Sequence, residues 1–126
     1  MRAVDTNVLV RLLTRDEPNQ AAVADAFVQH GAWVSVLALA EAMWVLAAVY
    51  ERDAAQLARA VEMLLNHQHL TLQEPEAVAA ALETFRRRPA LGFSDCLLVE
   101  LARKAGHLPL GTFDRDLSKV EGAARL

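Results

Sequence analysis

Four acidic residues stand out because each lies at the start or end of an expected structural element, among apolar neighbours. They are Asp5, Glu41, Asp95 and Asp114. Glu41 is the only charged residue between Val36 and Tyr50, and Asp95 lies between Phe93 and Leu97. Burying an isolated carboxylate is costly unless it is paired or binds a metal. Gathered at one edge of a sheet, these acids would form an all-oxygen pocket that suits Mg²⁺ or Mn²⁺.

Three of these acids also have an ordinary structural alternative. Asp95 could cap a helix, Asp114 could be a turn residue, and Glu41 could pair with an arginine. Any one acid is explained equally well by its alternative. A shared pocket explains better why all four lie at the ends of elements.

Two other groups of residues suggest different chemistry. His67 and His69 resemble half of a zinc site, but no second cluster of ligands follows. Cys96 would need a base such as His107 to act as a nucleophile, and we favour a small buried apolar side chain.

The acids are positioned by an alternation of short strands and helices. Short strands are expected at residues 1–4, 32–35, 70–72 and 108–112, with an edge strand in the tail at 119–126. Helices are expected at residues 7–13, 20–29, 36–50, 54–65, 74–87 and 95–105, the second capped by Asp16 or Asn19, the third by Ser35 and the fourth by Asp53. This order predicts an α/β fold with a mostly parallel central sheet of four or five short strands flanked by helices. Acids at the carboxyl ends of such strands would meet at one edge.

The composition fits one domain over residues 1–126 with an aliphatic core. Hydrophobic residues make up 54% and aromatic residues 6%, which favours closely packed helices. The single cysteine excludes an intramolecular disulfide framework, and no secretory signal is evident, so we expect a cytoplasmic protein. The net charge of −3 counts mildly against a nucleic-acid partner.

The segment Val36–Tyr50 is apolar apart from Glu41. It is shorter than a membrane span, and a central glutamate would be expensive in lipid, so no membrane association is expected. A helix that is apolar all round is buried on both sides. A second copy of the chain would provide the second cover, so we expect a homodimer using this helix, with Leu57, Val61 or Leu64 from the next. Trp33 and Trp44 are expected to fill the core or the dimer interface.

At full length the chain resembles the PIN-domain ribonucleases of the VapC type, the toxins of bacterial type II toxin–antitoxin systems. The segments that carry the resemblance are Val4-Asp5-Thr6-Asn7, Ser35-Val36-Leu37-Ala38-Leu39-Ala40-Glu41, Phe93-Ser94-Asp95-Cys96-Leu97-Leu98 and Leu110-Gly111-Thr112-Phe113-Asp114-Arg115-Asp116-Leu117. None is specific alone, whereas the four in this order and spacing are.

The resemblance implies a Mg²⁺- or Mn²⁺-dependent endoribonuclease, a homodimer and a small cognate antitoxin. The family's acidic quartet falls on Asp5, Glu41, Asp95 and Asp114, which would hold one or two ions that activate water. Asn7 and Thr112 match the polar residues that support the quartet. Asp116 is expected to be a cap. A non-catalytic PIN-like module that binds RNA or protein is the alternative.

Several arginines could contact RNA or the antitoxin. Arg11, Arg15 and Arg115 lie close in sequence to the acidic turns. The run Arg86-Arg87-Arg88 is better explained as a solvated helix end, where cations favour the helix dipole.

Overall fold

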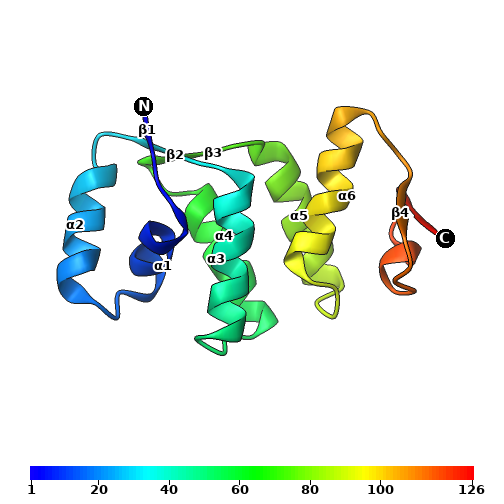
Figure 1. Cartoon of the computed structure of the whole chain (residues 1–126), viewed down its shortest axis with the longest axis horizontal. Coiled ribbons are helices and arrows are strands. Elements are labelled where there is room, and N and C mark those ends of the chain that lie inside the picture. The colour runs from blue at the N-terminus through cyan, green and yellow to red at the C-terminus, as the bar shows by residue number, and fades with distance from the viewer. The chain divides into compact units, whose positions relative to one another are not determined.

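The alternation of strands and helices predicted from the sequence is the architecture observed (Figure 1). The computed structural model describes all residues, 1–126, as two compact units, Met1–Pro75 and Glu76–Leu126. Each unit is described by itself below. The assignment of one domain to residues 1–126 remains a prediction.

The first unit contains a parallel sheet of three strands in the order β1-β2-β3. Its elements are β1 (Arg2–Ala3), α1 (Thr6–Thr14), α2 (Pro18–Val28), β2 (Ala32–Val34), α3 (Val36–Ala48), α4 (Ala54–Leu65) and β3 (Leu70–Leu72). Arg2 is opposite Ala32, which is opposite Leu70, so the carboxyl ends of the strands point the same way. Leu9, Val34 and Val61 are fully buried in the core.

Side chains at the helix starts explain where α1, α3 and α4 begin. The Asp5 carboxylate accepts the Val8 N–H at 3.1 Å, and the Ser35 hydroxyl oxygen accepts the Ala38 N–H at 3.0 Å. Asp53 forms a reciprocal capping box with Gln56. The predicted caps at Ser35 and Asp53 are therefore confirmed.

The predicted start of α2 is wrong by two residues. The helix begins at Pro18, whose fixed φ suits a first helical position. Neither expected cap is available, because Asn19 lies inside the helix and the Asp16 carboxylate is bonded elsewhere. It accepts the Thr14 and Tyr50 hydroxyls, each at 2.7 Å.

A polar network joins the end of α1 to the residues that follow α3. The Arg11 guanidinium donates to the Tyr50 oxygen at 3.1 Å and to Asp16 at 3.3 Å. It also bonds to Gln20 on α2. The pKa of Asp16 is lowered, mainly by the hydrogen bond from Thr14 and next by the one from Tyr50. The pKa of Arg11 is raised, mainly by its hydrogen bond to Tyr50. This network connects α1 with α2 and with the segment that follows α3.

The second unit pairs two long helices with a small parallel sheet. Its elements are α5 (Pro75–Arg87), α6 (Phe93–Ala105), β4 (Leu110–Thr112), a 3-10 helix η1 (Leu117–Lys119) and β5 (Ala123–Arg125). Leu110 is opposite Ala123, and Thr112 is opposite Arg125. Phe85 of α5 and Phe93 of α6 meet edge to face with their ring centroids 6.0 Å apart.

The α/β class, with parallel strands flanked by helices, is confirmed. The strands pair in parallel as a sheet of three within the first unit and a sheet of two within the second. β1 has only two residues and pairs with β2. None of the helices combines the length and the apolar character that crossing a membrane requires.

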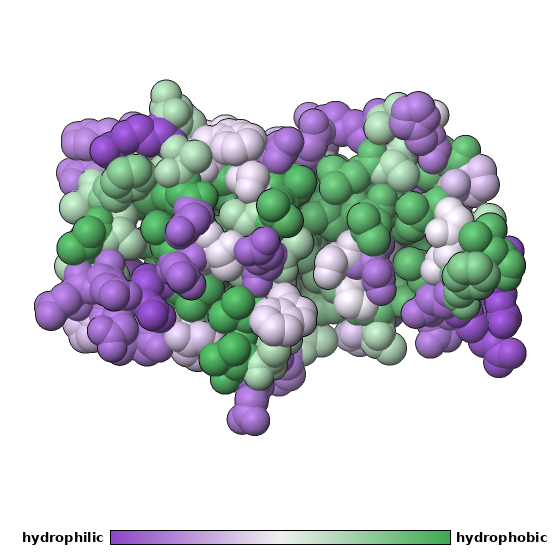
Figure 2. Space-filling model, viewed as in Figure 1, coloured by the Kyte–Doolittle hydropathy of each residue, from purple (hydrophilic) through white to green (hydrophobic).

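Within a single chain, α3 is covered on one side only. Leu39, Ala42 and Met43 are buried, but Leu37 and Trp44 are 66% and 67% exposed. Only one side of the helix packs against the first unit, so hydrophobic side chains reach the surface among polar ones over α3 (Figure 2). Val61 and Leu64 of α4 are fully buried and cannot form part of a dimer surface.

Candidate functional site

The first unit brings Glu41 next to the turn that carries Asp5. The Thr6 hydroxyl, one residue after Asp5, donates to Glu41 Oε2 at 2.9 Å. Asp5 and Glu41 are both exposed. No arginine of this unit pairs with Glu41, so the arginine alternative fails there. Thr6 holds one carboxylate oxygen of Glu41 and leaves the other open to a cation.

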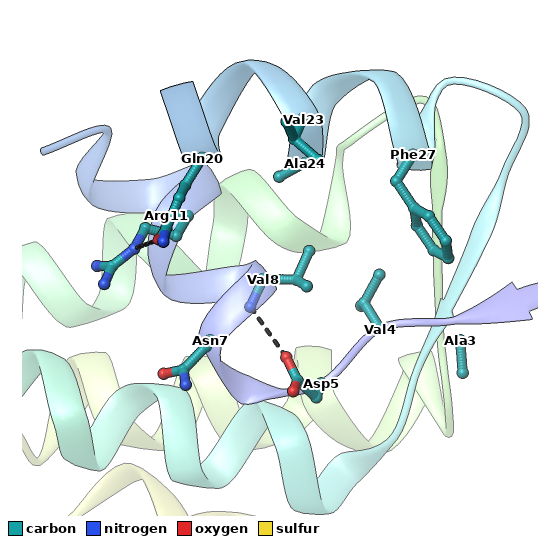
Figure 3. A pocket seen from close by; sticks show the side chains of 10 residues that line it. All are labelled: Ala3, Val4, Asp5, Asn7, Val8, Arg11, Gln20, Val23, Ala24 and Phe27. Atoms are coloured by element: carbon teal, nitrogen blue, oxygen red, sulfur yellow. Dashed lines mark hydrogen bonds between the residues drawn. The ribbon is translucent and has the colours of Figure 1, made fainter. Parts of the chain in front are cut away.

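Asp5 also lies at the edge of a groove of about 430 Å³ (Figure 3). The groove runs between α1 and α2, and most of its lining is apolar: Ala3, Val4, Val8, Val23, Ala24 and Phe27. Asp5, Asn7, Arg11 and Gln20 provide its polar groups. Asn7 is exposed, so its amide is accessible from solvent on the Asp5 side of α1.

In the second unit Asp95 lies in the first turn of α6, because this helix begins at Phe93. Gly92 occupies the N-cap position, and no side chain caps the helix, so the capping alternative for Asp95 fails. Asp95 is half-buried and forms no ion pair within its unit. Burial raises the pKa of Asp95, and the nearby charge of Asp114 raises it further.

Asp114 follows β4 and organises the turn that leads into η1. Its Oδ1 accepts the backbone N–H of Asp116 at 2.8 Å and of Leu117 at 3.0 Å. The Thr112 hydroxyl oxygen accepts the Asp114 N–H at 3.0 Å. Asp114 is therefore a turn residue, which was the structural alternative to a metal ligand. Only Oδ1 accepts these hydrogen bonds, and Oδ2 accepts none of them. Asp116 occupies the N-cap position of η1, as expected, but its side chain makes no capping hydrogen bond.

The donor set of these residues fits a divalent cation. Asp95 and Asp114 are two carboxylates that repel each other without a compensating cation in their unit. Within either unit, no three His, Cys, Asp or Glu side chains are grouped to hold a metal. The first unit carries Asp5 and Glu41 and the second carries Asp95 and Asp114, so neither unit by itself groups three such ligands.

The arginines predicted to contact RNA or an antitoxin differ in their environment. Arg11 is committed to the network with Tyr50 and Asp16, and Arg15 pairs with Asp25 at 2.6 Å. Arg115 is exposed and adjoins Asp114. Arg115 is the one of the three whose side chain has no partner within its unit.

Two residues near the acids were not singled out from the sequence. Thr6 bonds to Glu41 across 35 positions of the chain, which no local pattern shows. Phe113 precedes Asp114 and is 81% exposed. Its position directly before a candidate acid was visible in the sequence. It was overlooked because apolar neighbours of the acids were interpreted as evidence of burial.

The alternatives to an acidic site are not supported. Cys96 is buried, and that burial raises the pKa of its thiol to about 11, which keeps it protonated. The rings of His67 and His69 lie 5.8 Å apart, and the His69 N–H donates to Nδ1 of His67. Burial lowers the pKa of His67. These histidines bond to each other and to their own turn.

The fold and the acids at its strand and helix ends define an α/β protein with a candidate acidic centre. The family model of the PIN domain matches residues 2–123, so the chain belongs to the PIN-domain family. PIN domains are generally metal-dependent nucleases. No curated protein and no solved structure matches the chain.

We expect Asp95→Asn to raise the melting temperature in EDTA at pH 7. The raised pKa means that ionised Asp95 is less favourable in the folded chain than in the unfolded chain. The parent should recover this stability as the pH falls below the folded pKa and towards about 3.9, the ordinary value for aspartate. The difference between mutant and parent should therefore shrink on acidification, which thermal melts at several pH values would measure.

Asp53→Asn is the matched control, since Asn caps a helix as well as Asp does. A role of Asp95 in a buried ion pair would instead make Asp95→Asn lose about 3–5 kcal/mol at neutral pH. That loss of stability would contradict the inference that the Asp95 carboxylate has no cationic partner.

Proposed function

We propose that this chain is a Mg²⁺- or Mn²⁺-dependent endoribonuclease that acts in the cytoplasm as the toxin of a type II toxin–antitoxin pair. The observation that carries the proposal is the half-buried Asp95, whose pKa is raised by its burial and further by the charge of Asp114. Membership of the PIN family over residues 2–123 supports nuclease chemistry. The same match spans both units, which supports a single domain over residues 1–126.

In this proposal Asp5, Glu41, Asp95 and Asp114 act together as ligands of one or two ions. A bound ion would supply an activated water and would stabilise charge on the phosphate. The Thr6 hydroxyl orients Glu41, and the backbone amides after Asp114 orient its carboxylate, so the open oxygen of each is fixed. The Thr112 hydroxyl oxygen accepts the Asp114 N–H, and Asn7 in the first turn of α1 would assist Asp5 at the metal.

The antitoxin is proposed to cover Asp5. The groove between α1 and α2 is lined mainly by apolar side chains and ends at this carboxylate, with Val23 70% exposed within it. Apolar residues of a small partner would fill the groove, and a Lys or Arg from the partner would pair with Asp5 in place of the metal.

The central test is cleavage of labelled single-stranded RNA by the purified chain. We expect cleavage with Mg²⁺ or Mn²⁺ and none in EDTA. Asp95→Asn and Asp114→Asn should each slow it at least about 100-fold, since even the residues that support metal ligands are worth about 10–100-fold. Asp53→Asn should cleave as the parent does. RNA binding without cleavage by the parent would support a non-catalytic module instead.

The toxin role makes a separate prediction in living cells. Expression of the parent chain alone in bacteria should stop growth, because RNA cleavage is not restrained. Asp5→Ala at equal abundance should allow normal growth, and Asp53→Asn should remain toxic. Growth arrest by Asp5→Ala, measured with matched protein levels, would show that Asp5 is not part of the toxic site.

The exposed face of α3 supports a homodimer. Leu37, Trp44 and Val49 are each about two thirds exposed, and Glu41 shares the side of the helix on which Leu37 and Trp44 lie. Exposed large apolar side chains gathered on one helix are a feature of interfaces.

We expect a dimer by light scattering at micromolar concentration and a monomer for Trp44→Glu, because the charge would have to be buried. Val23→Glu places the same charge on an exposed site of α2 and should remain a dimer. A monomeric parent would remove the α3 interface.

A further inference from the structure

The second unit contains a groove that the acidic site does not use. It has a volume of about 470 Å³ and is lined by Thr84, Arg87, Arg88, Glu100, Arg103, Lys119, Val120 and Glu121. Three separate elements build it: the end of α5, the middle of α6, and η1 with the residues after it. Each element has a buried anchor in the core, Phe85 in α5, Val99 in α6 and Leu117 in η1, so the lining is held in place.

The groove has a surplus of positive charge in a chain whose net charge is −3. Four cationic side chains, Arg87, Arg88, Arg103 and Lys119, line it together with two acidic ones, Glu100 and Glu121. This positive charge is local to the groove, so the negative net charge of the whole chain does not reveal it.

The cations of the groove fall into two kinds. Arg103 is already engaged, since it pairs with Glu100 at 3.3 Å and donates to the Glu121 carbonyl at 2.7 Å. Arg87, Arg88 and Lys119 are exposed and have no ion pair within the unit. Arg103 therefore neutralises one of the acids and helps to fix the wall of the groove, while the other three remain available to a ligand.

The chemistry of the lining favours a phosphate backbone over a protein partner. Val120 is the only apolar residue in the groove, so a polypeptide would find no pocket for the aromatic or aliphatic anchors that dominate protein interfaces. Arginine, lysine and hydroxyl side chains are the groups that contact nucleic-acid phosphates. Two adjacent arginines and a lysine from another element suit a chain of phosphates.

The groove is also within reach of a strand bound at the acidic site. Glu100 and Arg103 lie five and eight residues after Asp95 on the same helix, which is about 7.5–12 Å along its axis. At about 100° per residue they point roughly 140° and 80° away from Asp95, so the strand would pass around α6.

We propose that this groove, with Arg87, Arg88 and Lys119 as its free cations, binds the phosphate backbone of single-stranded RNA beyond the cleavage site. This inference rests on the proposed function and names a second RNA contact for it. It also revises the interpretation of the run Arg86-Arg87-Arg88 as a solvated helix end, because Arg87 and Arg88 line a built groove.

The test measures RNA binding separately from cleavage. The full chain carrying Asp95→Asn is titrated in EDTA against a fluorescently labelled single-stranded RNA, and its affinity is measured by anisotropy at several KCl concentrations. Adding Arg87→Gln and Arg88→Gln should weaken binding. The slope of log K against log salt should become shallower by about 1.4, since each phosphate contact on a single strand contributes about 0.7.

Two controls make the result specific. Arg52→Gln with Arg59→Gln, in the first unit, removes the same net charge and should leave the slope unchanged. Arg87→Lys with Arg88→Lys keeps both charges and should retain most of the slope. Where the glutamine pair lowers the melting temperature, Lys119→Gln alone provides the measurement, with an expected change of about 0.7 in slope.

The outcomes separate this inference from the proposed function. RNA binding that is unchanged by the groove variants, or weakened equally by the control pair, overturns the groove and leaves the ribonuclease standing. No RNA binding by the Asp95→Asn chain in EDTA overturns the groove, whereas no cleavage by the parent chain with Mg²⁺ or Mn²⁺ overturns the proposed function. Binding of poly-glutamate that the groove variants abolish, with RNA affinity unchanged, would show an acidic protein partner instead.

Discussion

The repulsion between two carboxylates is the interaction on which the candidate site depends. Asp95 is half-buried in the first turn of α6. Its pKa is raised mainly by this burial and further by the charge of Asp114. The chain tolerates this cost because the rest of the unit fixes both residues. The Asp114 turn is held by backbone amides, and α6 is anchored by Phe93, Cys96 and Val99 in the core. A divalent cation would convert this repulsion into attraction, which is the physical reason for assigning the acids to a metal.

The sequence predicted the elements well where local chemistry decides them. Ser35 and Asp53 cap the helices they were expected to cap, and Gly106 ends α6 in the left-handed conformation that glycine favours. Cys96 is the buried apolar residue that its neighbours suggested. The α/β class followed from the same alternation of strands and helices.

The remaining features depend on contacts between distant residues, which periodicity does not reveal. Asp16 could not cap α2 because Tyr50, 34 positions away, donates to it. The Thr6 bond to Glu41 is equally remote in sequence. Apolar composition predicted that α3 needs cover on both sides, but it does not tell which side the chain itself covers and which, with Trp44, it leaves exposed.

The network of Arg11, Asp16 and Tyr50 has a consequence for the order of α1. This helix has nine residues, fewer than the roughly 12–15 that an isolated helix needs to be even marginally stable in water. Its first turn is held by the Asp5 cap and the bond between Thr6 and Glu41, and its last turn by Arg11. Fastened at both ends, α1 has little freedom to fray. Asp5 and Glu41 are therefore ordered before any ligand arrives, and less conformational entropy is lost when one binds.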